Sequence, residues 1–473
     1  MNIKNLLLNV DSYKAEGHWE QYPPNTTKIF SYIESRGCKF TDKMMFFGLQ
    51  YFIKEYLTEP FTIDDLNEAE EIFMAHGGSF NREGWEYILN TYGGHLPLII
   101  KAVPEGTVVP VGNVLVTVEN TDPKCYWLTS YMETALLRAV WYPSTVASNS
   151  FFLKQKLYDA LKKTSDLQDP ASLDFKLHSF GFRGVSSLES SGIGDMGHLV
   201  SFKGTDTMSG VMFARKYYDA DMAGFSVKAS EHSTQTSWTR EGERDAYLNL
   251  VEKYAKPGAI FSSVIDSYDT FGALDIYADT GLLDIVKERG ATAVMRPDSG
   301  DPLTMPIEVI KHLMNKPNIG YTTNSKGYKV LPDYVRVLQG DGINIHSMPK
   351  IIDNMINEGL SIENIVFGMG GGMLQSIDRD TFKMAMKCSW AEIDGVSTDV
   401  YKDPITDQGK KSKRGRLTLV QTEEEISTKR IEDVENEDIE LLRVVYDNKP
   451  VEEAYEKFDA IRNRSDFYLK EEV

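Results

Sequence analysis

From about residue 173 onward, short apolar segments alternate with amphipathic stretches. Each apolar segment has the length of a buried strand and ends at a polar or glycine-rich junction. The stretches at 242–255, 281–290, 306–315 and 349–359 have apolar residues at helical spacing. This pattern predicts a series of strand and helix units.

Seven such junctions follow one another at intervals of about 26 to 43 residues. A βα unit is on the order of 30 residues long, so seven in series favour an irregular parallel (β/α) barrel over an open sheet. In such a barrel the loops after the strands gather on one face and form the active site. The residues at these junctions are Phe180 with Arg183, Asp206, His232, Asp266, Asp298, Asp341 and Gly370.

The two ends of the chain have a different pattern. Strand-like alternation occurs at 28–35, 106–120 and 383–393, mixed with helical segments, and an acidic tail follows. We therefore expect an α/β barrel over residues 126–379 and an α+β domain assembled from residues 1–125 and 380–473. At the junction of the two, residues 125–142 predict a buried helix and residues 148–164 a surface helix.

The composition narrows the class of protein. A hydrophobic share of 41% with 26% charged residues is that of a globular protein with a packed core. The net charge of −19 disfavours nucleic-acid binding, because it repels the phosphate backbone. Three cysteines without CxxC spacing, and no apolar run near the roughly 18 residues of a membrane span, predict a cytoplasmic protein without a membrane anchor.

The junction residues suggest the chemistry of a phosphate-bearing substrate. Four aspartates at one face could hold a divalent cation, bind sugar hydroxyls or stabilise a developing positive charge, although each alone could be a helix N-cap. The run "FGMGGGMLQ" at 367–375 offers backbone NH groups for an anion, or is an ordinary glycine turn. The basic segment 410–416 is either a loop that covers an anionic ligand or a solvated one.

Several motifs of this chain resemble those of the nicotinamide phosphoribosyltransferase family, which are type II phosphoribosyltransferases. They are "FGFRGVSS", "FKGTDT", "EHST", "RPDSGDPL", "QGDG" and "FGMGGGMLQ", and with others they occur in the family's order from residue 11 to about 417. The resemblance implies transfer of the phosphoribosyl group of phosphoribosyl pyrophosphate to nicotinamide in NAD salvage. It also implies Mg²⁺, stimulation by ATP, and a homodimer with active sites at the interface.

The resemblance also assigns roles to individual residues. Phe180 and the partner subunit's Tyr13 would stack on the pyridine ring, and Asp206 would accept a hydrogen bond from the carboxamide. His232 is similar to the histidine that the family phosphorylates, with Glu231 orienting its ring. The other implied contacts are Arg183, Ser262 and Arg296 around the ring and ribose, Asp298, Gly340 and Asp341 at the ribose, Gly370 and Gly371 at its phosphate, and Arg36, Arg379, Lys387 and Lys410 at pyrophosphate or nucleotide phosphates.

Three positions depart from the family pattern. Ser179 stands where an aspartate is usual, Ala385 where a serine is common, and Met369 interrupts the glycine run. Two other functions fit the same residues: a nicotinate phosphoribosyltransferase, which shares the fold and chemistry, and a non-catalytic protein that senses a nucleotide in the same pocket.

Overall fold

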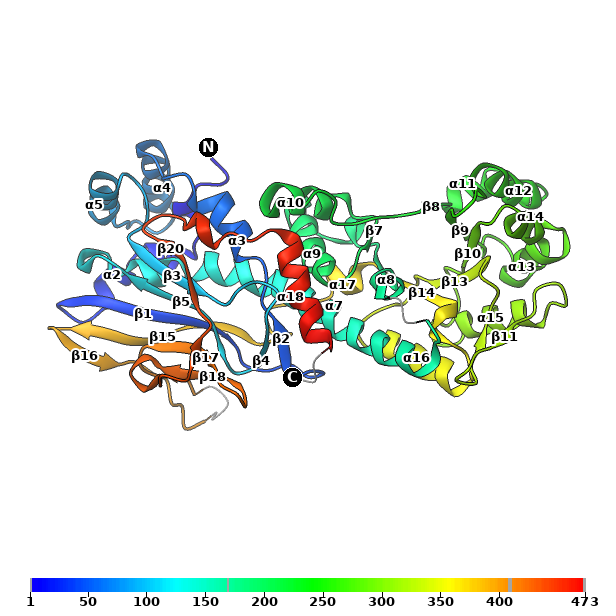
Figure 1. The fold of residues 1–473 in the computed structure, drawn as a ribbon. Coiled ribbons are helices and arrows are strands. Elements are labelled where there is room, and N and C mark those ends of the chain that lie inside the picture. Colours follow the sequence, from blue (N-terminus) through cyan, green and yellow to red (C-terminus); the bar gives the residue numbers. More distant parts are fainter. Residues whose placement is uncertain (1, 168–169, 407–410, 471–473) are drawn as a thin grey trace. The chain divides into compact units, whose positions relative to one another are not determined.

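The computed structural model describes residues 2–167, 170–406 and 411–470 (Figure 1). The chain divides into two compact units. The first contains residues 1–148, 216–220 and 378–473, and the second contains residues 149–215 and 221–377. That the barrel is the catalytic domain and the sheet-rich unit an accessory one remains a prediction.

The second unit contains the predicted barrel strands. Every pair of neighbours in its seven-stranded sheet is parallel. Each strand ends at one of the junctions expected from the sequence. In spatial order the strands are β7 (Gly204–Thr205), β6 (Leu177–Ser179), β14 (Ile365–Met369), β13 (Val335–Gln339), β10 (Thr292–Arg296), β9 (Ile260–Val264) and β8 (Lys228–Ala229).

The two edges of this sheet are joined by residues 225–229. Phe225 bonds β7 on one side, since its carbonyl accepts from Thr205 N at 3.0 Å and its own N donates to Lys203 O at 2.7 Å. Three residues later, β8 begins and pairs with β9. The sheet therefore curls into an irregular barrel, which confirms the expected fold class.

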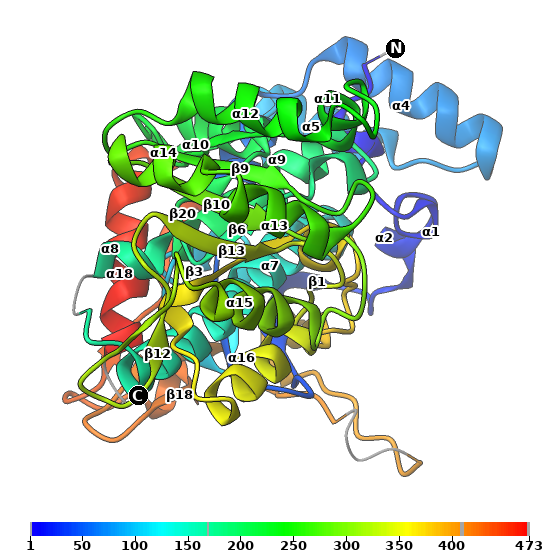
Figure 2. The ribbon, with the colours of Figure 1, turned by 90° about the vertical axis from the view of Figure 1, so that its right-hand side faces the viewer.

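Helices cover the outside of the barrel. The four amphipathic stretches form α12 (Glu243–Tyr254), α14 (Leu282–Glu288), α15 (Met305–Asn315) and α16 (Ser347–Asn357), as predicted (Figure 2). α12 contacts β9, α14 contacts β10 and α15 contacts β13. These contacts bury one face of each strand, so the opposite face lines the interior of the barrel.

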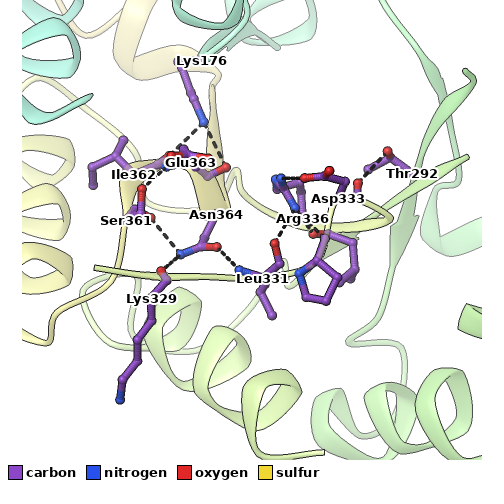
Figure 3. Close-up of polar contacts among 12 residues, drawn as sticks. Lys176, Thr292, Lys329, Leu331, Asp333, Arg336, Ser361, Ile362, Glu363 and Asn364 are labelled. Carbon is purple, nitrogen blue, oxygen red and sulfur yellow. Dashed lines mark hydrogen bonds and ion pairs between the residues drawn. The ribbon is translucent and has the colours of Figure 1, made fainter. Parts of the chain in front are cut away.

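A polar cluster joins β6 to the loop before β14 at the amino-terminal end of the strands (Figure 3). The ammonium group of Lys176 donates to the carbonyl oxygens of Ile362, Glu363 and Ile365 at 2.8, 3.2 and 2.8 Å. Burial, with Arg336 nearby, lowers the pKa of Lys176 to about 7. In a barrel of this kind the amino-terminal end serves stability rather than catalysis.

The first unit is built around an antiparallel sheet from both ends of the chain. Its long central pair joins β1 (Thr26–Ser35) to β15 (Met384–Ile393). The chain ends therefore form one sheet-rich unit, as expected. The full order is β16 (Val396–Asp399), β15, β1, β5 (Val114–Asn120), β3 (Leu98–Ala102) and β20 (Arg443–Asp447).

Two helical predictions were incomplete. The predicted helices at 125–142 and 148–164 are α6 (Leu128–Tyr131) and one 32-residue helix, α7 (Glu133–Thr164), which contains Pro143. Its second half is not a surface helix, since Ala147, Leu153 and Leu157 are buried. After the acidic segment 423–440 the chain forms α18 (Phe458–Lys470), which the sequence did not predict. Within the described residues, no helix has the length and apolarity needed to cross a bilayer.

Candidate active site

Side chains alternate along the barrel strands, so each strand places every second residue in the interior. In β9, Ser263 faces outward, because its hydroxyl bonds Tyr277 of the covering helix α13 (Thr270–Asp279) at 2.9 Å. Ser262 and Val264 therefore face inward. The register pairs Ser262 with Val294 and Val264 with Arg296, so these also face inward.

The same alternation reaches the residues beyond the strand ends. Continued by two positions, the inward rows lead to side chains at the carboxyl end of the barrel, where the active site of such a barrel lies. The aspartates that the sequence placed at junctions therefore share one mouth with the stacking phenylalanine. The inward positions are Phe180, Asp206, Asp266, Asp298, Gly340 and Gly370.

His232 lies between two of these carboxylates. Its Nε2 is 2.9 Å from Asp266 Oδ1, and its Nδ1 is 4.0 Å from Asp298 Oδ2. Asp298 is in turn 3.2 Å from Arg296 Nη2. The side chain of Asp266 is only 5% exposed and that of His232 is 45% exposed, so a buried carboxylate holds an imidazole that remains open to solvent.

Glu231 makes local bonds at the start of α11 (His232–Thr236). Its carboxylate accepts from the hydroxyl of Ser233, and its backbone N donates to Thr234 Oγ1 at 3.2 Å. The carboxylate that orients His232 is therefore Asp266. The sequence analysis had placed Asp266 at a junction but assigned the orientation of His232 to Glu231, its neighbour in the chain.

Phe180 lies against two glycines of neighbouring strands. A Cβ atom added to Gly368 would be 1.9 Å from Phe180 Cε2, and one added to Gly340 would be 3.5 Å from it. The backbone N of Phe180 also donates to Met369 O at 2.8 Å. The ring occupies the space that a side chain at 368 would fill, which explains why glycine is needed there.

Asp206 and His178 complete this side of the mouth. The carboxylate of Asp206 accepts from the hydroxyl of Ser226, and its backbone N donates to Ser179 O at 3.0 Å. The ring of His178 is 6.2 Å from that of Phe180, and burial lowers its pKa. His178 was not among the residues expected at the site, because a histidine inside a strand has no distinguishing pattern.

The remaining predicted residues of this unit flank the mouth. Arg183 is exposed on the short helix η4 (Phe182–Gly184). The Nε of Arg296 is buried and has no hydrogen-bond partner among the described residues. Asp341 is exposed, and its carbonyl accepts from Gln339 Nε2 at 2.9 Å. Gly370 precedes α17 (Gly371–Leu374).

A cluster of cations forms in the first unit. Lys387 on β15 is half-buried, and burial lowers its pKa; Glu133 raises it, whereas the positive charges of Arg36, Arg379 and Lys402 lower it further. The structure thus brings together three residues that the sequence assigned to phosphate groups. Lys402 is an addition that the sequence analysis missed, since it is isolated in a polar loop. We call these four residues the cation cluster.

Other predicted residues of the first unit have partners of their own. Tyr13 on α1 (Ser12–Ala15) is 60% exposed, and its ring meets that of His18 edge-on at 5.1 Å. In the basic segment, Lys411, Lys413 and Arg416 pair with Asp403, Glu34 and Glu119. Lys410 lies outside the described residues.

The amino-acid sequence matches two known protein families and several named relatives. The nicotinate phosphoribosyltransferase (NAPRTase) family matches residues 175–450, and the N-terminal domain of nicotinamide phosphoribosyltransferase matches residues 5–100. A relative in Xanthomonas campestris pv. campestris, named nicotinamide phosphoribosyltransferase, is 52% identical over 88% of both chains. One of the same name in Acinetobacter baylyi is 31% identical over 94% of both.

Solved structures show the same fold at low sequence identity. Nicotinate-nucleotide pyrophosphorylase from Pyrococcus furiosus has a TM-score of 0.61 at 15% identity, covering 99% of this chain and 97% of its own. Human nicotinic acid phosphoribosyltransferase has a TM-score of 0.52 at 15% identity, covering 94% of this chain and 90% of its own.

The irregular barrel of the second unit and the sheet-rich first unit, together with these relatives, define a phosphoribosyltransferase enzyme. The chain belongs to the nicotinate phosphoribosyltransferase family, and it carries the N-terminal domain of the nicotinamide phosphoribosyltransferases.

Proposed function

We propose that this enzyme transfers the phosphoribosyl group of phosphoribosyl pyrophosphate to nicotinamide, giving nicotinamide mononucleotide and pyrophosphate in NAD salvage. One observation carries the choice of substrate: the carboxylate of Asp206 faces the interior of the barrel on the strand next to Phe180. A carboxylate accepts a hydrogen bond from the carboxamide of nicotinamide and repels the carboxylate of nicotinate. Relatives of the chain that carry the amide's name support the same choice.

In this mechanism Phe180 holds the pyridine ring by stacking. The lone pair of the ring nitrogen attacks C1 of the ribose as the bond from C1 to the pyrophosphate oxygen breaks. The electron pair of that bond leaves with pyrophosphate, and the ring becomes a pyridinium, so no proton is transferred. We assign the stabilisation of the positive charge that develops on the ribose to Asp298, which lies at the mouth 4.0 Å from His232 Nδ1.

The leaving pyrophosphate is polyanionic, and the cation cluster of Arg36, Arg379, Lys387 and Lys402 would bind such phosphate groups. We include a homodimer in the proposal, in which Tyr13 of one chain stacks at the site of the other. Tyr13 has the exposure that this role needs.

Mg²⁺ would enter with the substrate. Among the described residues, no three His, Cys, Asp or Glu side chains are grouped to hold a metal ion. Mg²⁺ commonly binds through substrate phosphates and one or two carboxylates, and Asp266 and Asp298 are available for this. The ion neutralises phosphate charge when bound.

ATP would phosphorylate His232. If the Nε2 proton is donated to Asp266, Nδ1 keeps its lone pair and is the nucleophile. Nδ1 attacks the γ-phosphorus of ATP and ADP leaves; water later cleaves the phosphoimidazole. The added negative charge near the mouth would help to organise the magnesium pyrophosphate group. The phosphoryl step is thus coupled to ribosyl transfer but chemically separate from it.

A product assay tests the proposal. The full chain is incubated with phosphoribosyl pyrophosphate, Mg²⁺ and equal concentrations of nicotinamide or nicotinate, with and without ATP. We expect nicotinamide mononucleotide as the main product and a faster rate with ATP. Asp206→Ser should reduce the preference for the amide, and His232→Ala should abolish the ATP effect while slow basal synthesis remains.

Two results would contradict the proposal. A higher kcat/KM for nicotinate would make the enzyme a nicotinate phosphoribosyltransferase, the function named by the family that matches residues 175–450. Equal stimulation by ATP in His232→Ala would rule out the phosphohistidine.

We also place the reaction in the cytoplasm, since Cys38, Cys125 and Cys388 are free thiols, as in a reducing compartment.

A further inference from the structure

A buried carboxyl group lies behind the ring pocket, on the outer side of the barrel sheet. It belongs to Asp195 on α9 (Leu188–Ser201), and the residue is 0% exposed. The hydroxyl of Thr205 on β7 lies 2.9 Å from Asp195 Oδ2 and 3.1 Å from Oδ1. Thr205 points outward because its neighbour Asp206 points inward.

The bond to Thr205 fixes the turn that carries Asp206. Thr205 Oγ1 accepts from the backbone N of Thr207 at 2.9 Å, so its proton is directed to the carboxyl of Asp195. Thr205 and Thr207 flank Asp206 in the chain. The contact therefore holds the backbone on both sides of the residue that faces the carboxamide.

A second contact reaches the strand that carries Phe180. The hydroxyl of Ser179 lies 3.1 Å from Thr207 Oγ1 and lowers the pKa of Asp195, against the larger effect of burial. Ser179 directly precedes Phe180, and its carbonyl accepts from Asp206 N at 3.0 Å. One carboxyl thus ties together the ends of β6 and β7.

The carboxyl has little freedom to move. A Cβ atom added to Gly210, on helix α10 (Met208–Tyr218), would be 2.2 Å from Asp195 Oδ2. Its partners are neutral hydroxyl groups, and burial, with Asp206 nearby, raises the pKa of Asp195 to about 7. Burying an acid among neutral groups lowers the stability of the fold, whereas an apolar residue at the same place would not. A role at the site accounts for that cost.

We propose that Asp195 is a positioning residue for the pyridine site, which through Thr205 and Ser179 sets the relative placement of Phe180 and Asp206 and thereby the affinity for nicotinamide. This inference rests on the proposed function of the site. It also bears on Ser179, which stands where the family has an aspartate, because its hydroxyl favours the charged form of Asp195.

The test separates ring binding from general stability. Asp195→Ala and Thr205→Val, which is isosteric, each remove the contact, and both should raise KM for nicotinamide about tenfold. KM for phosphoribosyl pyrophosphate should stay near the wild-type value. Asp195→Asn should restore most of the affinity, because its amide oxygen still accepts from Thr205. Ser191→Ala is the matched control, since it removes another buried hydroxyl of α9, bonded to Ser209.

Two outcomes would overturn the inference. Folded Asp195→Ala and Thr205→Val enzymes could keep the wild-type KM for nicotinamide, or both Michaelis constants could rise together as in a general loss of structure. If Asp195→Ala does not fold, Thr205→Val decides. Calorimetric binding of nicotinamide to the free enzyme separates failure of the proposed function from failure of the role of Asp195. A wild-type enzyme that binds nicotinamide but makes no mononucleotide overturns the proposed function. In that case the affinity of each variant for nicotinamide, relative to that of the wild type, decides the role of Asp195.

Discussion

The imidazole Nε2 of His232 lies 2.9 Å from Oδ1 of Asp266, a residue that is 34 positions away in the chain. Glu231, the residue next to His232 in the chain, accepts a hydrogen bond from Ser233 instead. Since Asp266 is nearly fully buried, its charge acts on the ring with little screening by solvent.

The pairing predicts opposite results for the two acids. Asp266→Asn should lower the ATP-stimulated rate by about 10- to 100-fold, because a neutral amide lacks the charge of the carboxylate and can present its NH₂ group to Nε2, which no longer fixes the orientation and tautomer of the imidazole. Glu231→Gln should leave that rate near the wild-type value. Both are measured as formation of nicotinamide mononucleotide with and without ATP. A large loss in Glu231→Gln with normal activity in Asp266→Asn would contradict this assignment.

Gly368→Ala should weaken the binding of nicotinamide. The new Cβ would be 1.9 Å from the ring of Phe180, so the ring must leave its position. Aromatic stacking contributes about 0.5–1.5 kcal/mol, and its loss corresponds to a rise in KM of up to about tenfold. Gly184→Ala is the control, since its Cβ would meet its nearest atoms at an ordinary 3.5 Å. Equal Michaelis constants for the two variants would refute the steric argument.

Glu105→Gln should stabilise the first unit at neutral and alkaline pH. Glu105 is buried, accepts from Gln50 N at 2.7 Å and bonds the hydroxyl of Tyr218 at 2.8 Å. Burial raises its pKa from 4.5 to about 7. Between these two pH values the folded protein holds a proton that the unfolded chain has released, so the wild type loses stability as pH rises through that range.

The variant carries no such penalty. The free energy of unfolding of the variant minus that of the wild type should therefore increase by up to about 3 kcal/mol from pH 5 to pH 8. Denaturant unfolding at both pH values measures the difference. Glu71→Gln, which changes an exposed acid on α4 (Ile63–His76), is the control measured at the same two pH values. A pH-independent difference for Glu105→Gln would show that its carboxyl titrates as an ordinary one.

Lys176→Met should destabilise the barrel without affecting substrate binding. It leaves the buried carbonyl oxygens of Ile362, Glu363 and Ile365 without their donor, at a cost of about 1–3 kcal/mol. Lys311→Met, which breaks the exposed pair with Glu358, should cost less than about 1 kcal/mol. Denaturant unfolding gives both values. A change in KM for either substrate in Lys176→Met would contradict a purely structural role.

The barrel could be predicted because each strand is a local apolar run and each junction is a local break in it. These local patterns suffice to place Asp206, His232, Asp266 and Asp298 at one mouth. The long helix α7 was divided in the prediction, because Pro143 and the change to charged residues after it resemble a helix boundary. Burial by distant parts of the chain overrode that local pattern.

Partner choice within the mouth was outside the reach of the sequence. The end of each apolar run indicated which residues lie at the mouth, and the resemblance to the family implied the other candidate residues. Which carboxylate meets the imidazole, which cations join Lys387 and how residues 225–229 join the sheet edges depend on strand register and on curvature, which are set by contacts between segments far apart in the chain. Hydrogen bonds and charges act over a few ångströms in space, so only the tertiary structure decided them.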